Sequence, residues 1–283
     1  MNYKELLEFS DYAMDLTIRM AHHSTAIEGN TLTQNETASI LIDGVIPKAM
    51  SEREYYEVKN FQNFIPTLLK SLQEKQIIDN EYIKYIHSII MSNLIENCGK
   101  FKTIPNVVLG ANFEPTAPFK VPMVLKDWCD NLYYQLSSAK NDTQKLEIIM
   151  DSHIKFEHIH PFSDGNGRTG RMLIFYSVLE QDLVPFVITK DNKKDYIMAM
   201  REENVPMLVD MAKEAQEVER KRAMGFLEKY NNQLHLDNKR EQVQPISYLK
   251  ANPTTKPNPK HLHNNRFINN KNKGGKDDDR FGL

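Results

Sequence analysis

Cysteine is scarce in this sequence, with only Cys98 and Cys129 among 283 residues. Two cysteines make neither a disulfide framework nor a pair of metal ligands, and free cysteine is typical of proteins in a reducing compartment. No apolar run approaches the ~18 residues of a membrane span, and the first residues lack the apolar core of a signal peptide. We therefore expect a cytoplasmic protein with no membrane partner.

Net charge is also small, at a formal value of -2, which argues against a protein built to coat nucleic acid, so DNA binding is not expected. The Gly-Lys-Ser/Thr signature of a P-loop is missing, which excludes that kind of nucleotide site. In contrast, 40% of the residues are hydrophobic, and the length allows one large domain or two small ones. The chain can therefore bury a sizeable core.

Apolar periodicity and capping residues predict that nearly all of the ordered chain is helical. The first helix is expected over 3–28, ending at Gly29, and capping boxes at 33–36 and 51–54 open two more, to about residues 42 and 72. The remaining helices are expected over 80–98, 122–138 and 143–159, from 168 to before 185, and over 191–202 and 206–230.

Two stretches do not follow the helical pattern. Residues 104–118 are β-branched and bounded by Pro and Gly, so we expect a short β-hairpin flap between helices. An ordinary connecting loop is the alternative, although non-helical segments of this length in a compact domain are often functional. Residues 232–283 are rich in Asn, Lys, Pro and Asp, which predicts a largely disordered polar tail.

Most of the candidate functional residues lie between His160 and Arg171. Pro161 disfavours helix at His160, so the helix ends there and leaves a base beside a loop. Three residues then precede the next helix, whose unpaired N–H groups can bind an anion: Gly165, Asn166 and Gly167. The conjunction indicates attack of a hydroxyl on a nucleotide phosphate.

Two arginines and a carboxylate complete this stretch. Arg168 and Arg171 are three residues apart on one helix face, where a polyphosphate would neutralise them. Asp164 can hold Mg²⁺ that bridges phosphate oxygens. Each feature alone is common in ordinary turns and solvated helix faces. A zinc site at His153, His158 and His160 is disfavoured because no Cys or carboxylate has the usual ligand spacing.

Residues 160–171 resemble the motif of the Fic family, HxFx[D/E]GNGRxxR, at every specified position. The resemblance extends over about residues 80–230. It implies an all-α, Fic-like helical bundle with a β-hairpin flap, and transfer of AMP from ATP to a Tyr, Thr or Ser hydroxyl of a target protein or of the enzyme itself. The chain then divides into an N-terminal helical region (1–79), a Fic core (80–231) and a tail (232–283).

The family roles carry over to individual positions. The resemblance implies that His160 takes the proton of the target hydroxyl and that Asp164 binds Mg²⁺ or Mn²⁺. The phosphates of ATP would lie on residues Gly165, Asn166, Gly167, Arg168 and Arg171. A target segment would pair with the main chain of the flap residues Asn106, Val107, Val108, Leu109 and Gly110. The resemblance also allows a homodimer.

Glu28 lies at an electrostatically unfavourable position of the predicted helix. A carboxylate in the last turn of the helix over residues 3–28 opposes the helix dipole, at a cost of up to ~1 kcal/mol, unless a cation lies nearby. A solvated Glu is the simple interpretation. However, Ser24, Glu28 and Gly29 match [S/T]xxxE[G/N], which is similar to the inhibitory motif of class II Fic proteins. That resemblance implies an inhibitory helix over about 3–29, whose Glu28 pairs with Arg171.

Several functions remain compatible with these residues. The protein could add and also remove AMP, use another nucleotide, or transfer phosphate as the Doc branch does, although the intact Gly-Asn-Gly-Arg disfavours Doc-like chemistry. A nucleotide-sensing regulatory protein without catalytic activity is the non-enzymatic alternative. The sequence does not identify the target protein.

Overall fold

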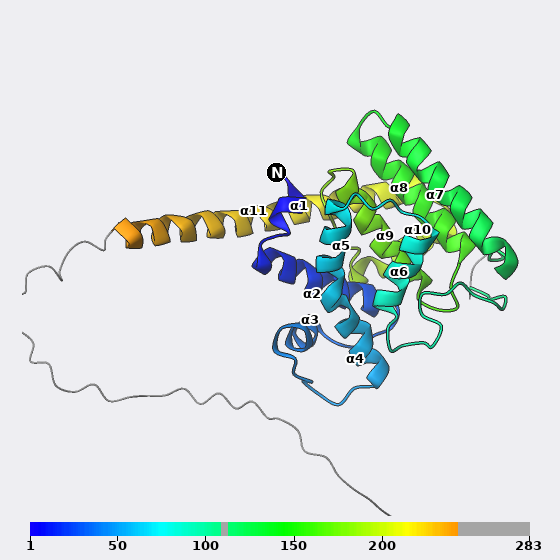
Figure 1. The fold of residues 1–283 in the computed structure, drawn as a ribbon, viewed down its shortest axis with the longest axis horizontal. Helices are drawn as coiled ribbons and strands as arrows, with labels where there is room; N and C mark the ends of the chain where they lie inside the picture. Colours follow the sequence, from blue (N-terminus) through cyan, green and yellow to red (C-terminus); the bar gives the residue numbers. More distant parts are fainter. Residues whose placement is uncertain (109–112, 243–283) are drawn as a thin grey trace, which may run out of the picture. The chain divides into compact units, whose positions relative to one another are not determined.

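The computed structural model describes residues 1–108 and 113–242. Within these ranges the regular elements are all helices, as the sequence predicts (Figure 1). They are α1 (Tyr3–Leu6), α2 (Ser10–Ile27), α3 (Gln34–Ala38), η1 (Ser39–Asp43), α4 (Glu52–Lys59), η2 (Asn60–Asn63), α5 (Phe64–Gln73), α6 (Asn80–Ile90), η3 (Pro118–Lys120), α7 (Val121–Ser138), α8 (Asp142–Ile159), α9 (Asn166–Glu180), η4 (Lys190–Asn192), α10 (Lys193–Arg201) and α11 (Val205–Gln242).

The core is built around α9, which is apolar nearly all round from Met172 to Leu179 and has all its residues buried except Gly167 and Glu180. A helix with no polar face must be covered on every side. Here α9 packs against α6, α8 and α2, and α7 packs against α8 in turn (Figure 1). Full burial of each large apolar side chain contributes about 1.5–3 kcal/mol. The loop that precedes α9 is therefore attached to the most firmly held element of the unit Met1–Leu236.

The N-terminal helices cover one side of this core. Helix α2 contacts α3, α4, α5 and α9. Its far side is tied to α11, where Tyr12 Oη donates to Glu219 Oε1 at 2.8 Å and Arg19 Nη1 lies 2.7 Å from Glu219 Oε2. Glu219 is only 1% exposed, so this contact is a buried ion pair that fixes α2 in place.

The segment predicted as a β-hairpin is non-helical from 101 to 108 and from 113 to 117, but no strand forms in those described residues. Backbone groups in this segment and just before it pair with residues of the α8–α9 region. Lys102 N donates to Pro161 O at 2.9 Å, and Thr116 N donates to His158 O at 3.4 Å. Of the predicted flap, Leu109 and Gly110 lie outside the described residues.

Several helix boundaries differ from the prediction. The helix expected over 3–28 is divided into α1 and α2 by a turn at residues 7–9. Helix α6 ends at Ile90, not at 98, because Asn60 Nδ2 donates to the carbonyls of Ile90 (3.1 Å) and Ser92 (2.7 Å) and replaces the next helical turn. The helix expected from the capping box at 51–54 to about residue 72 is divided into α4 and α5 by η2, and Pro66 lies in the first turn of α5, where its missing N–H costs nothing. Helix α11 continues to Gln242, beyond the predicted end at Tyr230.

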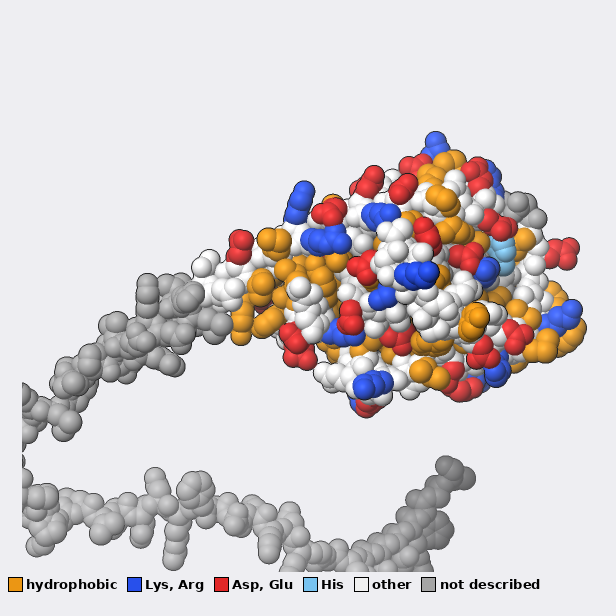
Figure 2. Space-filling model, turned by 90° about the horizontal axis from the view of Figure 1, so that it is seen from above, with side chains coloured by type: hydrophobic (Ala, Val, Ile, Leu, Met, Phe, Trp, Pro, Cys, Tyr) orange, Lys and Arg blue, Asp and Glu red, His pale blue; other side chains and the backbone are white. Residues whose placement is uncertain are grey.

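The surface mixes charges of both signs. On the face shown in Figure 2, the coloured Lys and Arg side chains lie among Asp and Glu side chains. In the described part of the chain, none of the helices combines the length and the apolar character that crossing a bilayer requires.

Candidate active site

His160 is held in a strained conformation between α8 and α9. Its φ is +48°, in the left-handed region that non-glycine residues rarely occupy, at a cost on the order of 1 kcal/mol or more. His160 N still donates to Phe156 O at 3.0 Å, and Pro161 follows. The helix therefore stops at the predicted residue. As a result, the imidazole lies at the start of the loop with 19% of its side-chain area exposed.

An aromatic contact with α6 anchors the loop. The Phe162 ring, which is completely buried, stacks on the His87 ring of α6 at a centroid distance of 3.7 Å. Gly99 N donates to His87 Nδ1 at 2.8 Å, so His87 Nε2 carries the proton and donates to Asp164 O at 3.0 Å. Burial lowers the pKa of His87 to about 4, which keeps this ring neutral. His87 thus fixes both the aromatic anchor and the backbone at Asp164.

Asn166 braces the loop with its side chain. Its Oδ1 accepts from Phe162 N and its Nδ2 donates to Phe162 O, both at 2.9 Å. The amide is 2% exposed, so Asn166 contributes loop shape and a backbone N–H to the site. Gly165 precedes α9 with φ +79°, and a Cβ there would meet Met91 Sδ at 2.4 Å. Glycine at position 165 therefore allows both the left-handed backbone and the close approach of Met91.

A carboxylate lies at the start of α9. A Cβ on Gly167 would be 2.8 Å from Glu28 Oε1, so the Glu28 carboxylate is seated against the bare backbone of this glycine. Glu28 Oε1 also accepts from Arg171 Nη2 at 2.6 Å. Arg171 Nε donates to Ser24 Oγ at 3.0 Å, and its Nη2 donates to Ser24 O at 2.9 Å. The residues of the predicted inhibitory motif and Arg171 thus meet in one place.

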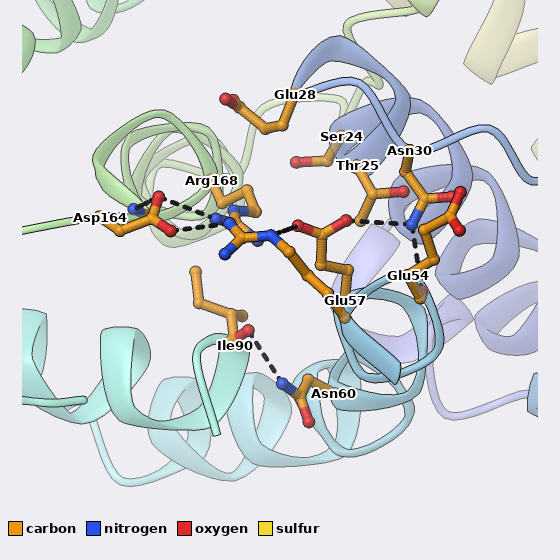
Figure 3. A network of polar contacts seen from close by, with 12 residues as sticks. Ser24, Thr25, Glu28, Asn30, Glu54, Glu57, Asn60, Ile90, Asp164 and Arg168 are labelled. Atoms are coloured by element: carbon orange, nitrogen blue, oxygen red, sulfur yellow. Dashed lines mark hydrogen bonds and ion pairs between the residues drawn. The ribbon is translucent and has the colours of Figure 1, made fainter. Parts of the chain in front are cut away.

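Arg168 has different partners from Arg171, one on α4 and one in the loop before α9 (Figure 3). Its guanidinium, 2% exposed, donates from Nη1 to Glu57 Oε1 at 3.0 Å and from Nη2 to Asp164 Oδ1 at 3.1 Å. Glu57 Oε2 accepts from Asn30 Nδ2 at 3.0 Å. Arg53 Nη2 completes the network by donating to Asp164 Oδ2 at 2.7 Å. Among the described residues, Arg168 Nε has no partner although it is buried.

The two carboxylates at the loop stay ionised. Burial on its own would raise the pKa of Glu28, but the charge and hydrogen bond of Arg171 hold that pKa below its usual value. Burial likewise acts to raise the pKa of Asp164, and the hydrogen bond from Arg53 with the charge of Arg168 overcomes it. At neutral pH, therefore, both arginines of the motif are neutralised by carboxylates of the chain itself.

The His160 ring is prepared to act as a base. Its Nδ1 lies 3.3 Å from Glu157 O, and a carbonyl only accepts, so Nδ1 carries the proton and Nε2 keeps its lone pair. Burial lowers the pKa of His160 to about 4, with the charge of Lys102 acting in the same direction. The imidazole is therefore neutral across the physiological range and can accept a proton at Nε2.

Asp164 is the residue that could hold a divalent cation. No group of three or more His, Cys, Asp or Glu side chains with metal-site geometry occurs among the described residues. Mg²⁺, however, is commonly bound by one carboxylate plus nucleotide phosphates and waters. Asp164 fits that pattern, because its side chain is 38% exposed and its partner Arg53 is 51% exposed and free to move away.

The predicted flap residues differ in accessibility. Val107 is 81% exposed. Asn106, in contrast, has its amide engaged, because Nδ2 donates to Phe162 O at 2.9 Å and Oδ1 accepts from Lys102 Nζ at 2.7 Å. Asn106 thus fastens the segment to the loop. Val108 is half-buried.

Sequence reasoning missed several residues that shape this site: Asn30, Arg53, Glu57, His87, Lys102 and Glu157. Each belongs to a helix or loop whose local pattern is ordinary. Glu57 is an example, because its 5% exposure on α4 is known only from the structure. The others are recognisable only through partners far away in the chain.

The geometry agrees with the comparisons to known proteins. A sequence profile of the Fic/DOC family matches residues 77–177. The chain is 30% identical over 187 residues to protein adenylyltransferase fic-1 of Caenorhabditis briggsae, covering 65% of this chain and 36% of that one. It is 29% identical over 177 residues to protein adenylyltransferase Fic of Drosophila willistoni, covering 62% and 34%. The chain thus spans about a third of the length of these relatives.

Solved structures show the same fold. A Fic-domain signalling protein from Bacteroides thetaiotaomicron superposes with a TM-score of 0.68 at 20% identity, covering 77% of this chain and 89% of that one. A fragment of Fic-1 from Caenorhabditis elegans gives a TM-score of 0.65 at 25% identity, covering 80% and 67%. Residues 77–177 of this chain therefore form a domain of the Fic/DOC family.

Proposed function

We propose that this protein transfers AMP from ATP to a hydroxyl group of a protein, and that Glu28 restrains the reaction. The observation that carries the proposal is the Glu28 carboxylate seated on Gly167 and Arg171 at the start of α9. An anion already lies at a helix N-terminus, beside a neutral histidine base. Such a position suits a phosphate equally well. The names of the curated relatives support the same activity.

The proposed step is a substitution at the α-phosphate. The oxygen of a Tyr, Thr or Ser hydroxyl forms a bond to the α-phosphorus as the bond between that phosphorus and the bridging oxygen of the β-phosphate breaks. Pyrophosphate leaves with the electron pair, and the hydroxyl proton passes to His160 Nε2. General-base help of this kind contributes about 10²–10⁴ in rate.

The remaining residues position the nucleotide. The backbone N–H groups of 165–167 and the guanidinium groups of Arg168 and Arg171 would bind the phosphates, and Arg168 Nε is a buried donor that awaits an acceptor. Mg²⁺ or Mn²⁺ at Asp164 would offset charge on the phosphate oxygens. Arg53 would leave Asp164 Oδ2 when the ion binds.

Glu28 restrains transfer by holding Arg171. While Arg171 Nη2 binds Glu28, a γ-phosphate cannot take that donor, so ATP lacks one of its anchors. A nucleotide bound without this anchor does not present its α-phosphate to His160. Removal of the Glu28 carboxylate therefore frees both Arg171 and the surface of Gly167.

Labelling with radioactive ATP tests this function. The Glu28→Gly protein is incubated with cell lysate and with ATP labelled with ³²P in either the α- or the γ-phosphate. We expect α-label in protein, at least about tenfold more than with wild type, since a released charged hydrogen bond of 1.5–3 kcal/mol corresponds to that factor. The Glu28→Gly, His160→Ala double variant is the matched control and should lose the label while still binding ATP.

The other functions give different results in the same experiment. Transfer of γ-label would show a phosphate transferase. Label from UTP or GTP, but not from ATP, would show another nucleotide specificity. Loss of pre-formed α-label on addition of wild-type protein would show AMP removal. No label with any variant would leave a nucleotide-sensing regulatory protein and would refute the transferase.

A further inference from the structure

The backbone on both sides of His160 is held by two side chains of the non-helical segment that follows α6. Lys102 Nζ lies 3.5 Å from Ile159 O, and Lys102 N donates to Pro161 O at 2.9 Å. Asn106 Nδ2 donates to Phe162 O at 2.9 Å. The carbonyl before His160 and the two carbonyls after it are therefore all bound by this pair of residues. Lys102 Nζ also donates to Asn106 Oδ1 at 2.7 Å, which links the pair.

These contacts are important because the left-handed backbone conformation of His160 is unfavourable by itself. A left-handed, non-glycine residue persists only where the surrounding structure fixes it. Pro161 has no N–H to contribute, so beside the N–H groups of His160 and Phe162 the loop is held through its carbonyls. The contacts from Lys102 and Asn106 supply that restraint directly at the strained residue.

Burial of the Lys102 side chain at this position costs desolvation free energy. It is 3% exposed, and a buried ammonium group loses hydration that two oxygen acceptors replace only in part. The pKa of its side chain falls accordingly, to about 8, because of burial. A neutral side chain could occupy the same space at a smaller desolvation cost, which suggests that the charge itself has a role. At pH 7 the group is still mainly cationic.

The charge of Lys102 acts on the neighbouring imidazole of His160. The charged groups that face His160 are Lys102 on this segment, Glu28 directly after α2 and Asp164 in the loop. Glu157 Oε2 of α8 lies 3.8 Å from His160 Nδ1, and this carboxyl is neutral at pH 7 because burial raises its pKa to about 8. The two carboxylates favour a protonated ring, whereas burial and the Lys102 charge oppose it. Lys102 thus counteracts the acidic neighbours and helps keep the ring a free base.

We propose that Lys102 is a positioning residue for His160: with Asn106 it fixes the loop backbone around the histidine, and its charge disfavours the imidazolium form. This role deepens the proposed transferase function and rests on it for its catalytic consequence. The effect on the histidine ring itself can be measured whether or not transfer occurs.

The test uses the Glu28→Gly protein and two readouts. One readout is the titration of His160 by NMR of protein with labelled histidine, assigned with His160→Ala. The other is steady-state transfer of AMP, which separates kcat from the KM for ATP. The variants are Lys102→Met, Lys102→Arg and Asn106→Ala. Lys100→Met is the matched control, because Lys100 is an exposed lysine two residues away.

Lys102→Met should raise the pKa of His160 and lower kcat by about tenfold or more, with the KM for ATP changed by less than about threefold. Lys102→Arg should restore both values, since it keeps the charge and the donors. Asn106→Ala should lower kcat with little change in the pKa of His160, because it removes a tether without removing charge. Lys100→Met should change neither.

An unchanged His160 titration and an unchanged kcat in folded Lys102→Met would overturn the assignment. Equal losses in Lys102→Met and Lys102→Arg would also contradict it, because they would show a requirement for lysine's shape alone. If the Glu28→Gly protein transfers no AMP at all, the proposed function fails. The NMR titration would then still decide whether Lys102 controls the ring.

Discussion

Arg171 is the residue on which the proposed regulation depends. Its guanidinium donates two hydrogen bonds to Ser24 of α2 and one to Glu28, the residue directly after α2. The guanidinium is 6% exposed, so it always requires an anionic or carbonyl partner. A γ-phosphate could replace Glu28 in that role at little cost. Ser24 would remain as a positioning contact in either state.

A second unusual carboxyl group lies near Arg171. Burial raises the pKa of Glu157 to about 8, against the charge of Arg171, and Glu157 Oε1 has no partner among the described residues. The folded protein therefore keeps this proton up to about pH 8, whereas the unfolded chain loses it near pH 4.5. Glu157 should make the protein progressively less stable as pH rises through this window.

Glu157→Gln should remove that penalty. We expect the variant to be more stable than wild type at pH 8, on the order of 1–3 kcal/mol, with a much smaller difference at pH 5. Urea denaturation at the two pH values measures the difference. Glu147→Gln, at an exposed position of the same helix, is the control. A Glu157→Gln difference that does not depend on pH would contradict a proton retained on Glu157.

Helix α4 contributes more to the site than its short length suggests. Glu57 connects Asn30, two residues after Glu28, to Arg168 of the loop (Figure 3). Arg53, one turn earlier, contacts Asp164. The segment that follows α2 and the loop before α9 are therefore joined through α4. Capping by Ser51 and Glu54 gives α4 a defined start, which fixes the direction of both side chains.

Removing Glu57 should disrupt this connection. Glu57→Ala leaves the buried guanidinium of Arg168 without its partner on α4, and breaking such a pair typically costs about 3–5 kcal/mol. Urea denaturation followed by circular dichroism measures the loss. Glu52→Ala, at an exposed position of the same helix, should cost less than about 1 kcal/mol. Equal losses in the two variants would show that Glu57 is not a structural link.

The sequence predicted the helical fold and the groups of the loop because these depend on local signals. The end of α8 at His160 follows from Pro161, and the burial of α9 follows from its apolar run. The end of α6 was missed because Asn60, 30 residues earlier, caps Ile90. Glu57 was missed for the same reason, since its partner Arg168 is 111 residues away. Such partners depend on packing, which a local pattern does not contain.

At the scale of the whole molecule, α2 is held between the core and α11. Its Arg19 and Tyr12 are bound to Glu219 on one side, while Ser24 and Glu28 bind Arg171 on the other. Helix α2 is therefore part of the folded unit Met1–Leu236 and not a loosely attached segment. Under the proposed function, activation would require release of the Glu28 contact alone, without removal of α2.

The central claim is that Glu28 and the γ-phosphate compete for Arg171. The most direct test is the ratio of ATP to ADP affinity, measured by calorimetry for wild type, Glu28→Gly and Glu28→Gly, Arg171→Ala. ATP carries the γ-phosphate and ADP does not, so this ratio reports the contact itself. Catalysis does not enter the measurement if His160→Ala is present throughout.

We expect wild type to bind ATP and ADP with affinities within about threefold of each other, because Arg171 is occupied. Glu28→Gly should prefer ATP by at least about tenfold, the value of one charged hydrogen bond of 1.5–3 kcal/mol. Arg171→Ala should abolish the preference. The same ATP to ADP ratio in wild type and Glu28→Gly would contradict competition at Arg171.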